Sequence, residues 1–376
     1  MGGGAETPPT EIGTRPWPLT MRILVLPGDG IGPEIVAACT RALEALEGAY
    51  GLGLALEAEA IGFASLERSG TTLTDDVVET ARAAAGVVLG PVSHHAYPPR
   101  EAGGLNPSAE LRRRLDLYAN IRPSRTRAGI RAPIEAMDLV IVRENTEGFY
   151  ADRNMYRGSG EFMPSADIAL AVRKITREAS RRIGRVAFDL ARRRRGRVTA
   201  VHKANVLHLS DGLFVEEQKR LAGEYADVAF DHMLVDAAAS WLVRDPARFD
   251  VIVTTNMYGD ILSNEAAELA GGLGLAESLN AGEAHGVAQA AHGSAPDIAG
   301  RDVANPSALL LSVAMLLEWL ADKHGRDDLA AAAAGLRDAL GGLLAAPTTR
   351  TADLGGELGT AAFADALVRR IAAGPR

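Results

Sequence analysis

The sequence predicts an α/β protein with a largely parallel or mixed sheet and two domains. Short apolar runs alternate with longer helical patterns, and the C-terminal third is mostly helical. The chain of 376 residues is too long for one typical domain and suits two. Hydrophobic residues make up 47% and charged residues 23%, as in ordinary globular enzymes, and the net charge of −8 argues against a general nucleic-acid-binding protein.

Residues 1–20 are rich in glycine, proline and threonine and contain no long apolar run. We expect a mobile extension there rather than a signal peptide or a membrane span, with Met21 as an alternative functional start. The longest apolar stretch begins at Ser307, includes Glu318 and is too short to span a bilayer. It indicates a buried helix and a cytoplasmic protein. Cys39 is the only cysteine, which excludes an intrachain disulfide.

The first strand is expected at 22–26, and a glycine-rich turn, GDGIGPE, follows at 28–34. The turn nearly matches the dinucleotide-binding pattern G-x-G-x-x-G, but Pro33 stands where the third glycine would allow close helix packing. Proline suits the first turn of a helix, so a helix is expected from Pro33 with Ile35 and Cys39 on its apolar face. The turn alone leaves two interpretations open: a pyrophosphate cradle, or a turn with another purpose.

Further apolar runs of the buried-strand type and two long helical patterns follow along the chain. The expected strands lie at 54–61, 86–90, 138–142, 197–201 and 249–255, and the expected helices at 167–194 and 211–225. A basic run at 191–197 is interpreted as a solvated helix C-terminus favoured by the helix dipole, with nucleic-acid contact as the alternative.

Three arginines are candidate site residues: Arg112 and Arg122 in the stretch AELRRRLDLYANIRP, and Arg143 directly after the expected strand at 138–142. Polar residues at strand ends are where α/β enzymes build their sites. A guanidinium binds a carboxylate through two parallel hydrogen bonds, so converging arginines suit a di- or tricarboxylate. Spacing alone leaves open the alternative that each arginine lies on a solvated face.

Lys203 leaves a strand in the stretch TAVHKANVL. A lysine held there can act as a general base once its pKa falls, with a surface lysine as the alternative. Asp236 follows a short apolar run, and Asp260 and Asn264 share one helix face four residues apart. Carboxylate and amide oxygens are hard ligands that suit Mg2+ or Mn2+, although an aspartate at a helix start is often a cap.

The loop at 291–306, AHGSAPDIAGRDVANP, has too many turn-forming residues for a plain linker. Asp297 could accept hydrogen bonds from the hydroxyl groups of a ribose, and its charge would repel a 2′-phosphate. An adenosine cofactor at this loop would therefore be NAD rather than NADP.

Six stretches in order carry a resemblance to a known family: GDGIGPE, LRRRLDLYANIRP, VRENTEGFY, HKANVL, FDVIVTTNMYGDILSN and HGSAPDIAG followed by ANP. Over residues 21–372 the chain resembles the β-decarboxylating dehydrogenases, which act on isopropylmalate, isocitrate, homoisocitrate and tartrate or D-malate. The resemblance implies an isopropylmalate-dehydrogenase-like two-domain fold rather than a Rossmann fold. It implies a cofactor-binding domain from residues 21–117 and 271–376, and a substrate and dimerisation domain from 118–270.

The resemblance also implies roles for the matching residues. Arg112, Arg122 and Arg143 would hold the malate carboxylates, and Tyr150 would protonate the substrate carbon after CO2 leaves. Lys203, with Asp236 nearby, would serve as base or proton relay for the 2-hydroxyl. Both would reach into the partner's site, so the resemblance implies a homodimer with shared active sites.

The cofactors follow from the same resemblance. Asp260, Asn264 and the partner's Asp236 would bind Mg2+ or Mn2+. The turn with Ile31 would line the cofactor cleft. The adenosine half of NAD would bind the distant loop through His292, Gly293, Ser294, Ala295, Pro296, Asp297 and Asn305.

Two departures from the family pattern bear on the substrate and the metal. Asn264 stands where most relatives carry a third aspartate. Ser108, with Ala109 beside it and Asn106 before it, replaces the leucine pair that packs the isopropyl group in isopropylmalate enzymes. A buried isopropyl group would lose roughly 1.5–3 kcal/mol without that wall, so a small or polar C3 substituent is expected, with Asn106 and Ser108 among its contacts.

The sequence thus predicts NAD- and metal-dependent oxidative decarboxylation of a 3-substituted (2R)-malate, an isopropylmalate- or homoisocitrate-type 2-hydroxy acid, to a 2-keto acid. The alternatives are a tartrate or D-malate dehydrogenase, and a non-catalytic regulatory paralogue that binds substrate or nucleotide. No nucleic-acid or membrane partner is expected.

Overall fold

The computed structural model describes residues 20–150, 155, 158 and 160–374, so the expected extension lies almost entirely outside the described residues. The strands are β1 (Met21–Leu26), β2 (Leu54–Ala58), β3 (Gly86–Leu89), β4 (Ala119–Arg125), β5 (Asp138–Glu144), β6 (Glu161–Ser165), β7 (Ile168–Ala171), β8 (Arg197–His202), β9 (Ala229–Leu234), β10 (Val251–Thr254), β11 (Leu279–Ala281) and β12 (Gly286–Ala288). The helices are α1 (Gly32–Tyr50), α2 (Phe63–Ser69), α3 (Asp75–Ala83), α4 (Pro107–Arg114), α5 (Arg177–Arg192), α6 (Ser210–Ala222), α7 (Val235–Arg244), α8 (Asn256–Leu269), α9 (Ser307–His324), α10 (Asp327–Ala345) and α11 (Thr360–Ala372).

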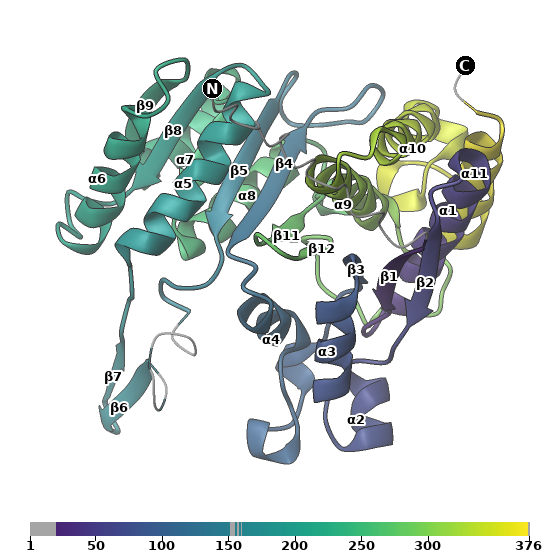
Figure 1. The fold of residues 1–376 in the computed structure, drawn as a ribbon, viewed down its shortest axis with the longest axis horizontal. Coiled ribbons are helices and arrows are strands. Elements are labelled where there is room, and N and C mark those ends of the chain that lie inside the picture. Colours follow the sequence, from purple (N-terminus) through teal and green to yellow (C-terminus); the bar gives the residue numbers. More distant parts are fainter. Residues whose placement is uncertain (1–19, 151–154, 156–157, 159, 375–376) are drawn as a thin grey trace, which may run out of the picture.

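One large mixed sheet runs through the described part of the molecule, in the order β2-β1-β3-β12-β11-β4-β5-β10-β8-β9 (Figure 1). Pairing is parallel within β2-β1-β3-β12 and within β5-β10-β8-β9. The antiparallel pairs, β12-β11, β11-β4 and β4-β5, lie between these halves. The predicted α/β class with a mixed sheet is therefore confirmed.

Each half of the sheet packs against its own helices, and four buried apolar clusters result. Two clusters join β1, β3 and β12 to α1, α3, α9, α10 and α11. The other two join β5, β8 and β10 to α5, α6, α7 and α8. We propose that these two groups are the cores of the two domains, with the first built from both ends of the chain. Cys39 is buried in the first group, and burial raises the pKa of its thiol.

The helix expected at 167–194 was wrong in its first part. Residues 161–171 form the hairpin β6-β7, which projects from the sheet as an arm (Figure 1), and α5 begins only at Arg177. Thr176 caps that helix by accepting a hydrogen bond from the Ala179 backbone N–H. A short apolar run such as Ile168–Ala171 fits a strand or a helix equally well by pattern, and the threonine cap was overlooked.

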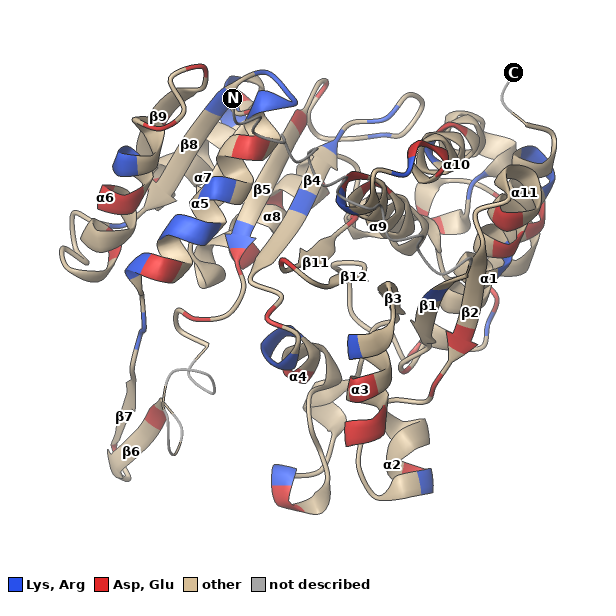
Figure 2. Ribbon diagram, viewed as in Figure 1, with Lys and Arg blue, Asp and Glu red and all other residues tan. Residues whose placement is uncertain are grey.

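The basic run at the end of α5 is largely exposed, as expected for a solvated helix end, and its arginines also form ion pairs. Arg192 pairs with Asp227, and Arg194 pairs with Asp138 and Asp250, the last of which is buried. Positive and negative segments are interspersed over both halves of the molecule (Figure 2). Among the described residues, no helix is long and apolar enough to cross a membrane.

Candidate active site

Two buried arginines converge on one carboxylate at the end of the antiparallel pair β4-β5. Arg122 on β4 and Arg143 on β5 both donate from Nη1 to Asp260 Oδ1, over 3.2 Å and 2.5 Å. Asp260 lies in the first turns of α8, just after β10, whose Thr254 is in register with Arg143. The strand pairing thus places three residues that are far apart in sequence at one point.

The charges at this point shift the pKa values of the groups. Burial opposes ionisation of Asp260, but the charges of Arg143 and Arg122 outweigh it and hold the pKa of the carboxyl below its ordinary value. Burial, together with the charge of Arg143, lowers the pKa of Arg122 to about 10. Asp260 and Arg122 are therefore ionised at neutral pH, and two guanidinium groups against one carboxylate leave a surplus of positive charge that suits an anionic ligand.

Neutral side chains hold the two arginines in place. Asn120 Oδ1 accepts from Arg122 Nε over 2.6 Å, and Asn256 Oδ1 accepts from Arg143 Nε over 2.8 Å. Helix α8 can approach β5 this closely because a Cβ on Gly259 would lie 2.6 Å from Arg143 Cβ. Asn120, Asn256 and Gly259 were missed as site residues, although the stretches YANIRP and TTNMYGD contain them.

Tyr150 and Arg112 complete this cluster. The Tyr150 hydroxyl donates to Asp260 Oδ2 over 3.2 Å, and the Arg143 guanidinium lies 5.3 Å from the centre of its ring. Arg112 lies in the last turn of α4, and its positive charge also lowers the pKa of Asp260. The structure therefore brings the three predicted arginines and the predicted acid together around one carboxylate.

Lys203 and Asp236 form a second group. Lys203 Nζ pairs with Asp236 Oδ1 over 2.8 Å, and this hydrogen bond lowers the pKa of Asp236. The pair follows β8 and β9, which lie two and three strands from β5 in the sheet, or roughly 10 Å and 14 Å across it. The Asp236 side chain is 64% exposed. The pair is thus accessible from outside this chain.

The residues expected at a metal fit an oxygen-liganded ion only in part. Asp260 and Asn264 lie one turn apart on α8 and offer carboxylate and amide oxygens, which suit Mg2+ or Mn2+. Within the described part of this single chain, no group of three or more His, Cys, Asp or Glu side chains could hold a metal ion. A site built here would therefore need a further carboxylate, such as the partner's Asp236.

Asn264 offers a direct test of the metal site. We expect Asn264→Asp to bind Mn2+ roughly tenfold more tightly than the wild type, because an added carboxylate contributes about 1.4 kcal/mol of attraction. Isothermal titration calorimetry with Mn2+ measures the two dissociation constants. Equal dissociation constants would show that the side chain at 264 does not face the ion.

The glycine-rich turn at 28–34 is packed against two other loops. Ile31 N donates to Ser294 O over 2.8 Å, and a Cβ on Gly30, whose φ is +58°, would lie 2.0 Å from that same oxygen. The buried carboxylate of Asp29 accepts from the backbone N–H groups of Phe63 and Ser93. The glycines thus serve contacts between protein backbones, and the turn holds the 291–306 loop beside it.

The 291–306 loop presents a group suited to a nucleotide. Within the described part of the chain, His292 Nε2 is buried without a hydrogen-bond partner, while Nδ1 contacts Gly293 O at 2.9 Å. A buried unpaired ring nitrogen is costly and fits a ligand that supplies its partner. Glu34 anchors the loop from α1 by accepting from the Gly300 and Asp302 backbone. The exposed residues nearby are Gly293, Pro296 and Asp297.

Three residues that were predicted to contact a ligand have hydrogen-bond partners within the chain. Asn305 donates to Asp353 over 2.9 Å and accepts from Ser307 N at the start of α9. Asn106 caps α4 by accepting from Ala109 N. Ser108 is 8% exposed and donates to Gln289 Oε1 over 2.9 Å. Asn305 and Asn106 thus support the local backbone, and Ser108 is tied to the side chain of Gln289.

Glu147, just after β5, is a buried carboxyl that the sequence did not single out. It accepts from the backbone N–H and the hydroxyl of Thr176, the cap of α5. Its own backbone oxygen accepts from Asn256, which holds Arg143. Burial, together with the charge of Glu144, raises the pKa of Glu147 to about 7. This carboxyl therefore titrates near neutral pH beside the site.

The raised pKa predicts how stability depends on pH. The folded chain binds this proton more tightly than the unfolded chain, so the contribution is full below about pH 4.5 and is lost as pH rises through about 7. In urea unfolding, Glu147→Gln should gain up to about 3 kcal/mol relative to the wild type between pH 4.5 and 8. The exposed Glu67→Gln should show no such trend. A difference that does not change with pH would contradict the assignment.

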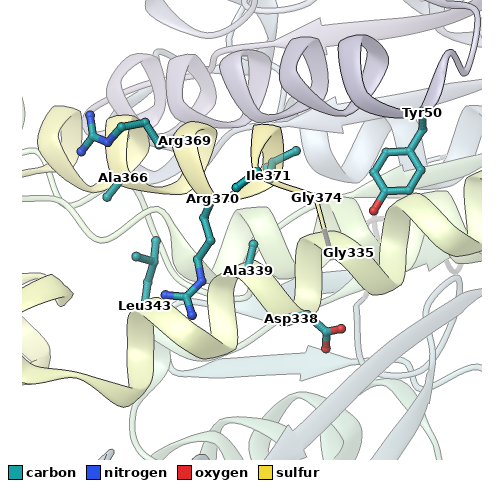
Figure 3. A pocket seen from close by; sticks show the side chains of 11 residues that line it. Tyr50, Gly335, Asp338, Ala339, Leu343, Ala366, Arg369, Arg370, Ile371 and Gly374 are labelled. Atoms are coloured by element: carbon teal, nitrogen blue, oxygen red, sulfur yellow. The ribbon is translucent and has the colours of Figure 1, made fainter. Parts of the chain in front are cut away.

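A groove formed by α1, α10 and α11 lies apart from this cluster (Figure 3). Its charged side chains, Asp338, Arg369 and Arg370, are exposed, and no predicted site residue lines it. The Asp260 cluster is therefore the candidate active site.

The comparisons with known proteins agree on one family. A sequence model of the isocitrate/isopropylmalate dehydrogenases matches residues 22–367. The isocitrate/homoisocitrate dehydrogenase of Thermus thermophilus is 42% identical over 94% of this chain and 99% of its own. The 3-isopropylmalate/3-methylmalate dehydrogenase of Methanocaldococcus jannaschii is 40% identical over 93% and 98%. The crystal structure of isocitrate dehydrogenase from Methylococcus capsulatus matches with a TM-score of 0.83 and 39% identity, covering 94% of this chain and 100% of that chain.

Proposed function

Because the chain belongs to the isocitrate/isopropylmalate dehydrogenase family, we propose that it catalyses the NAD- and divalent-metal-dependent oxidative decarboxylation of a 3-substituted (2R)-malate. The products would be a 2-keto acid, CO2 and NADH. The observation that carries the proposal is the convergence of Arg112, Arg122, Arg143 and Tyr150 on Asp260.

Substrate binding rests on the arginines. In the structure, the Asp260 carboxylate accepts from Arg122 and Arg143 in the way that a substrate carboxylate would. Fixed guanidinium groups orient a small dianion and exclude misplaced substrates. With substrate present, the same donors would turn to it, and Asp260 and Asn264 would be left to hold the Mg2+ or Mn2+.

The two cofactors supply what side chains cannot. NAD, when bound against the 291–306 loop, accepts a hydride, and the divalent ion, when bound, acts as a Lewis acid toward developing negative charge. His292 and Asp297 would contact the adenosine half of NAD. Asp260, Asn264 and the partner's Asp236 would hold the ion.

The proton transfers fall to Lys203 and Tyr150. Lys203 would take the proton from the 2-hydroxyl as the hydride leaves C2. The bond from C3 to its carboxylate then breaks, CO2 departs, and the electron pair leaves an enolate. Tyr150, which already lies within hydrogen-bond reach of Asp260, would donate a proton to C3. Each proton and each electron pair that moves in this sequence therefore has a donor and an acceptor.

A homodimer with shared sites fits the distribution of these groups. The Lys203–Asp236 pair is set apart from the arginine cluster within one chain and is exposed enough to meet a second subunit. The β6-β7 arm also exposes several apolar side chains that water disfavours. They are Phe162, Met163, Ile168 and Leu170. A second copy of the chain would cover them and complete each site.

The C3 substituent is proposed to be small or polar. Ser108 lies near the position at which a leucine wall would stand, and its hydroxyl is used internally. His94 lies near Arg112, whose charge, after burial and the neighbouring His95, lowers the pKa of the His94 ring. The relatives are named for isocitrate, homoisocitrate, isopropylmalate and methylmalate, so a substituted malate is favoured over D-malate or tartrate.

An assay of NADH formation tests the substrate proposal. The panel comprises D-malate, tartrate, 3-isopropylmalate, isocitrate and homoisocitrate, each with NAD and Mn2+. We expect the largest kcat/KM with an acid whose C3 substituent is small or polar. Fastest turnover of 3-isopropylmalate would overturn the assignment of the substrate pocket.

Cofactor preference gives a separate prediction. We expect NAD to exceed NADP by at least about tenfold in kcat/KM, because the exposed Asp297 would repel a 2′-phosphate. The same ratio measured for Asp297→Asn should shrink, since the amide carries no charge. A wild-type preference for NADP would refute the role of this aspartate.

A further inference from the structure

The side chain of Gln289, a neutral amide at the end of β12, contacts Arg112. Arg112 Nη2 donates to Gln289 Oε1 over 3.3 Å, and Ser108 Oγ donates to the same oxygen over 2.9 Å. Gln289 follows β12 directly and is 8% exposed, so water competes little for this oxygen. One acceptor atom therefore serves two residues of α4.

The partners of Gln289 fix the orientation of a chain of amides. A guanidinium only donates, so the atom that faces Arg112 must be the amide oxygen. Asn280 presents its Nδ2 to the same oxygen over 3.4 Å. This leaves Asn280 Oδ1 to accept from Asn145 Nδ2 over 3.0 Å, and that nitrogen also donates to Leu117 O over 3.0 Å.

The amide chain joins the two arginine-bearing parts of the site. Asn280 and Asn145 are 1% and 0% exposed, and Asn145 follows Arg143 by only two residues. The chain therefore runs from the helix that carries Arg112 to the strand end that carries Arg143. Buried polar networks whose members are paired hold their geometry rigidly, which suits a site that must present several guanidinium groups together.

We propose that Gln289 is a positioning residue, which orients the Arg112 guanidinium toward the substrate carboxylate. This inference rests on the proposed function, in which Arg112 binds that carboxylate. A neutral amide oxygen fixes the direction of the guanidinium without neutralising its charge, so the charge remains available to an anion. Gln289 acts through Arg112 and touches neither the reacting atoms nor the cofactor.

Steady-state kinetics of three variants tests the inference with the acid that the wild type turns over fastest. Gln289→Met removes the acceptor and should raise KM for that acid about 10- to 100-fold, while kcat changes less than about threefold. Gln289→Glu keeps an acceptor oxygen in place and should raise KM less than Gln289→Met does, although its negative charge offsets part of the positive charge of Arg112. Gln218→Met is the matched control, since Gln218 is a fully buried glutamine on α6 that donates to Ser180 O. It should leave KM unchanged.

Three outcomes would overturn the inference. They are a KM for Gln289→Met within about threefold of the wild type, an equal defect in Gln289→Glu, or an equal defect in Gln218→Met. Gln289→Ser, which lets water reach the site, replaces the methionine variant if that variant does not fold.

Crystal structures separate this inference from the proposed function. If the wild type turns over no acid of the panel, the proposed function fails, and the position of Arg112 in the crystals becomes the test. A guanidinium displaced in Gln289→Met and restored in Gln289→Glu supports the inference. An unmoved guanidinium overturns it.

Discussion

Lys203→Met is expected to lower kcat by about 10²- to 10⁴-fold, with a smaller change in KM, because it removes the group that we propose takes the proton from the 2-hydroxyl. The methionine retains the length of the side chain and loses only its amine. Stopped-flow measurement of NADH formation with the preferred acid gives the rate of the hydride step directly.

A matched control separates chemistry from folding. Lys174→Met removes a lysine that follows β7 and lies outside the proposed proton path, and it should leave the rate of NADH formation near that of the wild type. A Lys203→Met enzyme that retains more than about a tenth of the wild-type kcat would mean that another group takes the proton.

Mixing two inactive variants is expected to restore activity. Tyr150→Phe should by itself lower the overall rate about 10²- to 10⁴-fold, since it removes the acid that we propose protonates C3. In a mixed dimer of Tyr150→Phe and Lys203→Met, one site combines an intact tyrosine from one chain with an intact lysine from the other. Random reassortment makes half of the dimers mixed, so about a quarter of wild-type activity should return.

The mixing experiment requires mixed dimers and a control with each variant alone. Co-refolding or prolonged incubation of the two variants supplies the mixed dimers, and each variant treated alone should stay inactive. If activity does not return although mass spectrometry shows mixed dimers, Lys203 and Tyr150 serve a site within one chain, and the shared-site proposal fails.

The fold class and the family were predictable because apolar runs and short motifs, which are local features of the sequence, indicate them. The apolar runs at 138–142 and 197–201 became β5 and β8, and the family and its fold are confirmed by the comparisons. The arm β6-β7 was not predictable in the same way. Its exposed apolar residues have neither the alternation of a half-buried strand nor a core to face within one chain.

The charged members of the candidate site were easier to find than the neutral ones. Arg143 lies near the end of β5, Asp260 lies in the first turns of α8, and Arg122 stands out as a charge within β4. In the sequence alone, Asn256 and Gln289 cannot be distinguished from other polar residues, because their roles depend on partners far away in the chain. Asn256 lies 113 residues from Arg143, and Gln289 lies 177 residues from Arg112. Such pairs become visible only when strand order brings the segments together.

Ser108 and Asn305 illustrate a distinction that the sequence does not make. Both stand in motifs that bear on ligands, and each was expected to contact a ligand directly. The structure instead ties Ser108 to Gln289 and Asn305 to Asp353. A residue in a functional motif can serve the motif by holding its backbone or its neighbours, and the sequence does not separate these two roles.

We propose that hydride transfer and loss of CO2 are coupled in one reaction at the Asp260 cluster. The most direct measurement follows NADH and CO2 together, with the preferred acid, NAD and Mn2+, for the wild type and for Asp260→Asn. The account predicts equal amounts of NADH and CO2 from the wild type and neither from the variant. NADH without CO2, or undiminished production of both by Asp260→Asn, would contradict it.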